Sequence, residues 1–245
     1  NGSGTSSYRV NAPIDLASTG SFKTKNGADA EITHTIITAL GNAGSTTGTD
    51  LQGMNGALDG NYVLGADIDA SATAGWNDGK GFAPVGYFDN YFTGTFDGLG
   101  HVIKKLTIKN PVDSEGNAQD AGLFGSAEGA SIQNVGLTDV DISGTLNDEY
   151  LATGGLAGYI NLTYIKSSFV TGQVSGEDNV GGLVGYVDNS SVNNSYSTAG
   201  VYGKDDALGV GGLIGYFARM VSGFDGDIGI FHSYAAGPGK AYTKL

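Results

Sequence analysis

Asp97 and His101 stand close together in the phrase TFDGLGHVI. A carboxylate and an imidazole can act together as a general acid and a general base in catalysis. The phrase also has a simpler interpretation. Asp-Gly-Leu-Gly is a turn sequence in which the Asp side chain caps its own backbone, and His101 then begins the next strand. We favour this structural role for both residues.

Two pairs of carboxylates alternate with apolar residues, Asp67 with Asp69 in ADIDA and Asp139 with Asp141 in TDVDI. In a strand, this alternation turns the apolar residue inward and both carboxylates outward. Two stacked pairs could hold Ca²⁺, which takes about six to eight oxygen ligands. We favour a solvated face whose charge prevents edge-to-edge sheet pairing, because the chain has no EF-hand loop or Gly-Asp calcium repeat.

Other catalytic arrangements have less support. The chain has no Gly-x-Ser-x-Gly phrase, no Cys and no His-x-x-x-His pair, and its three histidines lie far apart. The only basic pair, Lys104-Lys105, is expected to form a bend rather than the base of a lyase. We therefore predict a protein that is not an enzyme and has no cofactor and no metal. The alternative is a carbohydrate-active enzyme, a polysaccharide lyase or hydrolase, because spacing alone does not show whether two carboxylates face each other across a cleft.

Two segments that interrupt the regular pattern are the candidate ligand-binding sites. The only tryptophan, Trp76, precedes Asn77 and Asp78, and an aromatic face beside an amide and a carboxylate is a common way to hold a sugar. The last repeat has eight extra residues, which include Arg219 and Phe224, and insertions in solenoids often lie on the binding face. The structural interpretations are favoured, in which Trp76 folds over a corner and the insertion covers the end of the stack.

A repeated phrase, Gly-Leu-x-Gly, indicates which elements position these residues. Its leucines recur at steps of 33, 27 and 30 residues, and a second apolar position follows the leucines by 12, 13, 13 and 21 residues. A period of this length is typical of a solenoid. We expect each set of residues to form an inward-facing row. The first set is Leu123, Leu156, Leu183 and Leu213, and the second is Val135, Phe169, Tyr196 and Tyr234.

The pattern inside each repeat predicts strands. Runs of five to eight residues alternate with period two, are rich in Val, Tyr and Phe, and end in Gly, Asn, Asp or Ser, whereas no stretch shows helical spacing. The 43 glycines suit many tight turns. We therefore predict an all-β, parallel β-helix (β-solenoid) with about 30 residues per coil. Residues 1–45 would form an opening coil or cap, 46–119 irregular coils and 120–245 regular repeats of one continuous solenoid domain.

Composition restricts the partners. The formal net charge is −13, with 25 acidic and 12 basic residues, which disfavours nucleic acid, anionic membranes and acidic polysaccharides. No apolar run approaches the roughly 18 residues of a membrane span, so we expect no membrane insertion.

The phrase GGLVGY followed by SYSTAGVYG resembles the GLUG motif. GADIDAS, GFAPVG and FTGTFDGLGHVI resemble phrases that precede this motif in large bacterial exoproteins of the filamentous-haemagglutinin type, including adhesins. The resemblance covers residues from about 14 to 240, although the motif also occurs in other secreted proteins and the last insertion and the tail depart from the pattern. It implies a right-handed parallel β-helix that acts as the stalk or display surface of a secreted or cell-surface protein. Its implied partners are a host-surface protein or a glycan and the neighbouring coils of a longer parent protein; an inert structural spacer is the second alternative.

Overall fold

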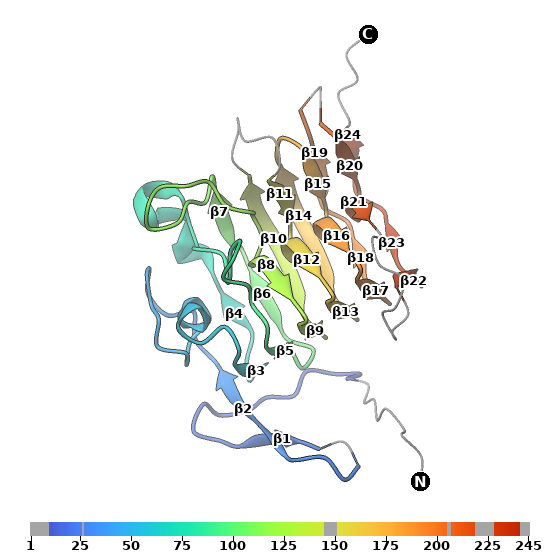
Figure 1. The fold of residues 1–245 in the computed structure, drawn as a ribbon. Helices are drawn as coiled ribbons and strands as arrows, with labels where there is room; N and C mark the ends of the chain where they lie inside the picture. Colours follow the sequence, from blue (N-terminus) through green and yellow to red (C-terminus); the bar gives the residue numbers. More distant parts are fainter. Residues whose placement is uncertain (1–9, 26, 145–150, 205–206, 219–227, 241–245) are drawn as a thin grey trace.

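The computed structural model describes residues 10–25, 27–144, 151–204, 207–218 and 228–240. These residues form 24 short strands and three 3₁₀-helices (Figure 1). The strands belong to four sheets, and every pairing between them is parallel except that of β1 with β2. The all-β class predicted from the period-two pattern is confirmed.

We name the sheets by their number of strands in the described residues. The eight-stranded sheet contains β1 (Phe22–Thr24), β2 (Ile32–Ile37), β3 (Asn61–Leu64), β5 (Thr95–Asp97), β9 (Ser131–Gln133), β13 (Tyr164–Lys166), β17 (Ser191–Asn193) and β22 (Gly229–Phe231). The nine-stranded sheet contains β4 (Ile68–Asp69), β6 (Val102–Lys104), β7 (Thr107–Lys109), β10 (Gly136–Ser143), β14 (Phe169–Ser175), β18 (Tyr196–Ser197), β19 (Gly200–Tyr202), β23 (Tyr234–Ala235) and β24 (Gly239–Lys240). The four-stranded sheet contains β8 (Phe124–Glu128), β12 (Ala157–Asn161), β16 (Val184–Asp188) and β21 (Ile214–Ala218). The three-stranded sheet contains β11 (Ala152–Gly154), β15 (Asn179–Gly181) and β20 (Gly209–Gly211), and the 3₁₀-helices are η1 (Gln52–Gly56), η2 (Ser71–Gly75) and η3 (Asn77–Gly79).

The chain crosses the sheets repeatedly in one order. Strands β11, β12, β13 and β14 follow one another through the three-, four-, eight- and nine-stranded sheets, and β15, β16, β17 and β18 repeat that order. Gly154 pairs with Gly181 and Gly181 with Gly211, so successive circuits are 27 and 30 residues long. The circuits therefore have the same lengths as the steps between the leucines.

The leucines of the repeated phrase lie at equivalent positions inside the stack. Leu123, Leu156 and Leu183 are 0% exposed, whereas Leu213, in the last circuit, is partly buried against the same core. The backbone N–H of Leu183 donates to the carbonyl of Leu213 at 2.9 Å, which places them on adjacent circuits. A glycine follows two residues after each leucine because backbones meet there: a Cβ on Gly185 would lie 2.5 Å from the backbone nitrogen of Thr153.

The second predicted row differs from the observed one. Phe169 pairs with Gly136, not with Val135, and its ring covers Gly136 so closely that a Cβ there would clash with it. Val135 lies one residue earlier and points into the core, where it is 1% exposed. Successive side chains of a strand point to opposite faces, so the aromatic residues, one position after the inward one, point outward. Their rings form a stacked row there. The centroid separations are 5.0 Å from Phe169 to Tyr196 and 5.2 Å from Tyr196 to Tyr234.

Serine side chains hold the corner between the eight- and nine-stranded sheets. Ser168, Ser195 and Ser233 each donate a hydroxyl hydrogen bond to the carbonyl two residues earlier, at 3.0, 2.9 and 2.7 Å. The N–H of Ser168 donates to Ser195 Oγ and the N–H of Ser195 to Ser233 Oγ, both at 3.1 Å. The residue before each serine has a left-handed backbone, with φ of 51°, 49° and 48°. These hydroxyls therefore join consecutive circuits.

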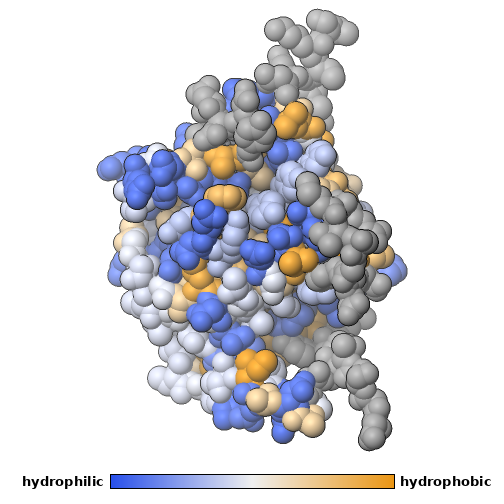
Figure 2. Space-filling model, in the orientation of Figure 1, coloured by the Kyte–Doolittle hydropathy of each residue, from blue (hydrophilic) through white to orange (hydrophobic). Residues whose placement is uncertain are grey.

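On the face visible in Figure 2, hydrophobic residues form small separate groups among hydrophilic ones, outside the grey residues. Such scattered groups are ordinary for a protein surface. None of the helices in the described part of the chain is long and apolar enough to cross a membrane.

Candidate ligand-binding face

The outer face of the eight-stranded sheet carries polar side chains on four adjacent strands. The central residue of each three-residue strand points inward and is 0% exposed, so its two neighbours point outward by alternation. The outward positions pair in register across β5, β9, β13 and β17. We call them the polar face: Thr95, Ser131, Tyr164 and Ser191 in one row, and Asp97, Gln133, Lys166 and Asn193 in the other.

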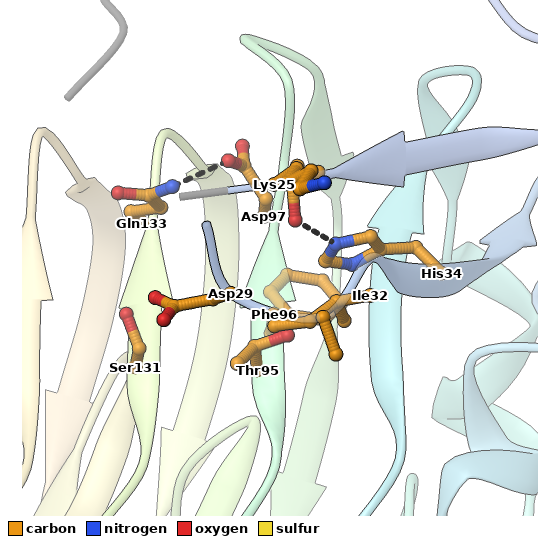
Figure 3. A pocket seen from close by; sticks show the side chains of 11 residues that line it. Lys25, Asp29, Ile32, His34, Thr95, Phe96, Asp97, Ser131 and Gln133 are labelled. Atoms are coloured by element: carbon orange, nitrogen blue, oxygen red, sulfur yellow. Dashed lines mark hydrogen bonds between the residues drawn. The ribbon is translucent and has the colours of Figure 1, made fainter. Parts of the chain in front are cut away.

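A hollow of about 410 Å³ lies at one end of the polar face, between the β1–β2 hairpin and strands β5 and β9 (Figure 3). The hairpin contributes Lys25, Asp29 and His34, and the sheet contributes Asp97 and Gln133. Figure 3 shows these side chains around one space, although they come from segments far apart in the sequence. The volume is in the range of small-molecule sites.

Asp97 is held firmly at the wall of this hollow. Its Oδ1 accepts from the backbone N–H of Leu99 at 2.8 Å and from Asn134 Nδ2 at 3.0 Å, and its Oδ2 accepts from Gln133 Nε2 at 2.6 Å. The side chain is almost fully buried. The bond to Leu99 is the local turn cap expected from Asp-Gly-Leu-Gly. The two amide donors come from the next circuit and were not foreseen from the sequence.

His101 does not join Asp97. Its Nδ1 lies 3.2 Å from Asp67 Oδ1 and its Nε2 lies 3.0 Å from the carbonyl oxygen of Ile14. The imidazole is 2% exposed, so these two contacts engage both of its nitrogens inside the protein. The structure therefore keeps His101 away from Asp97, and the pair of neighbouring residues does not form an acid–base site.

His34 is a member of the hollow that the sequence analysis left without a role. Its Nε2 lies 2.9 Å from Thr24 Oγ1, while its Nδ1 is buried and has no hydrogen-bond partner. Burial lowers the pKa of His34, and the nearby carboxylate of Asp97 opposes this shift without reversing it. A neutral imidazole whose Nε2–H donates to Thr24 leaves Nδ1 as an acceptor for a hydroxyl or amine. The alternation in ITHTII could have placed His34 on this side of the strand, but only the folded hairpin brings it to Asp97.

A second, smaller recess of about 240 Å³ lies farther along the polar face. Its lining includes Tyr164, Lys166, Asn193 and Phe231. Tyr164 is 41% exposed, and Asn193 Oδ1 is buried without a hydrogen-bond partner. The polar face thus combines hydroxyl, amide, carboxylate and ammonium groups between two recesses.

The predicted segment around Trp76 lies elsewhere. Trp76 is partly buried and packs against the core, and Asn77 Nδ2 donates to the carbonyl of Gly81 at 2.7 Å. Asn77 and Asp78 help to line a third hollow of about 510 Å³, but Trp76 is not part of its wall. Arg219 and Phe224, the other predicted contacts, lie outside the described residues.

The carboxylate pairs of ADIDA and TDVDI do not stack on each other. Asp69 pairs with Lys104 of β6, which lies between β4 and β10 in the sheet. Asp67 accepts from Lys104 Nζ at 2.9 Å, and Asp141 forms an ion pair with Lys109 at 2.8 Å. Desolvation raises the pKa of Asp67, but hydrogen bonds from Lys104, Val102 and His101 leave it below its ordinary value. Within the described ranges, no group of three or more His, Cys, Asp or Glu residues is arranged to hold a metal ion.

Comparison with known proteins gives three similarities. Residues 176–202 match the GLUG motif. The chain is 34% identical over 199 residues to Halomucin of Haloquadratum walsbyi, a match that covers 73% of this chain and only 2% of that protein. A solved structure from Bacteroides ovatus, described as a candidate immunoglobulin A1 protease, aligns with a TM-score of 0.44 and 21% identity over 78% of this chain and 63% of that chain, which is too weak a likeness to support an argument. This chain thus contains a GLUG motif within repeated, mostly parallel β-structure, and it is similar to a short section of a far longer protein.

Proposed function

We propose that this chain is a right-handed parallel β-helical section of a secreted or cell-surface protein, and that it displays a ligand-binding surface without catalysing a reaction. The GLUG match and the similarity to Halomucin support an extended surface-associated protein. The resemblance to filamentous-haemagglutinin-type adhesins supports a role in contact with a host, a cell or a glycan. The observation that carries the proposal is the polar face, which extends over four strands and has a recess at each end.

The ligand that best suits the polar face is a neutral glycan. Adjacent strands are about 4.8 Å apart, so the two rows offer polar groups at regular intervals along the direction in which the circuits stack. An extended chain of sugars can meet several such positions at once, which adds weak contacts. Tyr164 is exposed and Lys166 is half-buried, so their hydroxyl and ammonium groups can exchange hydrogen bonds with sugar hydroxyls.

Binding to a glycan array and to cells tests this proposal. Tyr164→Ala and His34→Ala change the two recesses, and Tyr234→Ala is a matched control because Tyr234 is also exposed but belongs to the nine-stranded sheet. Loss of one hydrogen bond or aromatic contact of about 1 kcal/mol weakens binding about fivefold. We expect this loss for the first two variants and no change for the control. If all three variants bind as tightly as the unaltered protein, the polar face is not the binding surface. If no ligand is found on the array or on cells, the inert spacer is favoured.

A carbohydrate-active enzyme is the second candidate, and one observation favours it. His34 lines the same hollow as Asp29 and Asp97, so an imidazole that could take a proton lies near two carboxylates. Asp97 already accepts three hydrogen bonds, which suits a positioning role better than proton transfer. Turnover of a polysaccharide that His34→Gln abolishes, with the melting temperature retained, would establish the enzyme in place of the display module.

A further inference from the structure

A row of aromatic rings crosses the outer side of the four-stranded sheet and the loop beside it. Tyr159, Tyr186 and Tyr216 pair in register on β12, β16 and β21. Their ring centroids are 5.6 Å and 5.0 Å apart, and Tyr91 continues the row at 6.4 Å from Tyr159. Phe88 lies 6.1 Å from Tyr91 and ends the row. The two ends are open to solvent, since Phe88 is 66% and Tyr216 is 44% exposed.

A line of acceptor groups runs parallel to these rings. Glu128, Asn161 and Asp188 pair in register at the ends of β8, β12 and β16. Asn161 and Asp188 come two residues after Tyr159 and Tyr186, so they point to the same side of the sheet. We call the five rings and these three residues the acidic aromatic row.

Two acceptor atoms of this row lack donors among the described residues. Asn161 Nδ2 donates to Glu128 Oε1 at 3.3 Å, but Asn161 Oδ1 and Asp188 Oδ1 are buried and have no hydrogen-bond partner. None of the ion pairs found among the described residues includes Glu128 or Asp188. Buried polar groups are nearly always paired, so this line of acceptors is the kind of site that gains from an added donor.

The charges that act on this row from the described residues are negative. Desolvation raises the pKa of Tyr159, and the carboxylates of Asp188 and Glu128 add to this shift. Burial also raises the pKa of Asp188 itself, and the backbone hydrogen bond from Asn189 only partly opposes this shift. The aromatic row of the nine-stranded sheet differs, since apart from burial only Tyr234 raises the pKa of Tyr196. The described residues thus form two rows of neighbouring aromatic rings, and among these residues only the row on the four-stranded sheet is bordered by carboxylates.

We propose that the acidic aromatic row is a docking surface for a lysine- or arginine-rich segment of a partner protein. A cation gains from the negative face of an aromatic ring within about 6 Å of its centre and from a carboxylate nearby, and this row offers both at each step. Ammonium and guanidinium groups also pair with carboxylates, and Glu128 and Asp188 form no ion pair with another described residue. The net charge of −13 attracts such a segment over a longer range. This surface lies on a different sheet from the polar face and does not depend on the glycan proposal.

Binding of a synthetic oligo-lysine peptide tests the inference, measured by calorimetry or fluorescence anisotropy at low and physiological salt. Two variants change the row: Tyr216→Leu, and the double variant Glu128→Gln with Asp188→Asn. Two matched controls lie on the nine-stranded sheet: Tyr234→Leu removes an exposed ring, and Asp139→Asn neutralises an exposed carboxylate. All variants are first compared with the unaltered protein by thermal melting, and Phe88→Leu replaces Tyr216→Leu if that variant melts early.

We expect Tyr216→Leu to weaken oligo-lysine binding about fivefold, as the loss of one cation–π contact of about 1 kcal/mol predicts, and the double variant about 25-fold through the loss of two such charged contacts. The controls should bind within twofold of the unaltered protein, and the same peptide with acetylated lysines should not bind. Equal losses in row and control variants would show attraction by overall charge and overturn the proposal. Binding of the acetylated peptide, or displacement of oligo-lysine by a neutral oligosaccharide, would also overturn it.

Discussion

The buried carboxyl group of Asp120 makes the stability of this protein depend on pH in a direction opposite to that of most paired carboxylates. Asp120 is 7% exposed; its Oδ1 accepts from the N–H of Ala152 and its Oδ2 accepts from Ser126 Oγ, both at 2.8 Å. Burial raises the pKa of Asp120 from 3.8 to about 6, and the two hydrogen bonds only partly oppose this shift. No cation is among the groups that determine this value.

The sign of the effect follows from proton binding. The folded state holds the proton of Asp120 more tightly than the unfolded state, so the free energy of unfolding is highest below pH 3.8, falls between about 4 and 6, and is constant above that range. At 1.36 kcal/mol for each pKa unit, the difference between 3.8 and about 6 corresponds to about 3 kcal/mol. Asp120→Asn cannot ionise, keeps the shape of the side chain, and can still accept from Ala152 and donate to Ser126 Oγ.

We therefore expect Asp120→Asn to match the unaltered protein at pH 4 and to be up to about 3 kcal/mol more stable at pH 8. Urea unfolding followed by circular dichroism at pH 4, 6 and 8 measures the difference between the midpoints. Asp139→Asn is the control, because this substitution removes the same charge from an exposed side chain. A difference for Asp120→Asn that stays the same from pH 4 to pH 8 would refute the reasoning.

Three further predictions concern the stack. Leu183→Ala should lower the free energy of unfolding by about 2–5 kcal/mol through the cavity it leaves in a fully buried row, measured by urea unfolding; a cost below 1 kcal/mol would contradict tight packing there. Ser195→Ala should cost about 1–3 kcal/mol, because it leaves the buried N–H of Ser168 without an acceptor, and faster amide exchange at Ser168 would show the same loss. Thermal melts with and without a calcium chelator should agree within a few degrees, since Asp67 and Asp141 face lysines; a large fall with chelator would instead indicate a structural calcium site.

The position of Val135 shows where sequence reasoning about the stack reached its limit. The spacing from each leucine to the next anchor identified Phe169, Tyr196 and Tyr234 as equivalent, and the structure pairs them in register. The same counting placed Val135 with them, but Gly136 occupies that position because the ring of Phe169 leaves no space for a side chain. A displacement by one residue reverses the face, so the aromatic row points outward although its members are apolar.

The candidate sites were less predictable than the fold. The sequence drew attention to Trp76, which packs against the core, and not to His34, which lines the hollow with Asp97. His34 and Asp97 are brought together by a hairpin that folds across two later strands. The acidic aromatic row could have been suspected from GGLVGYVD alone, where Tyr186 and Asp188 share one side of a strand.

Local chemistry by itself determined the class of this protein. The period of about 30 residues, the period-two alternation and the recurring glycines are patterns of residue type along the chain, so they can be read from the sequence. Tertiary structure alone decided which circuits meet in which register, where the β1–β2 hairpin lies, and which carboxylates remain without a cation. These outcomes depend on packing and hydrogen bonds between residues about 30 or more positions apart, such as Asp97 with Gln133 and Asn161 with Asp188, and no local pattern specifies such pairs.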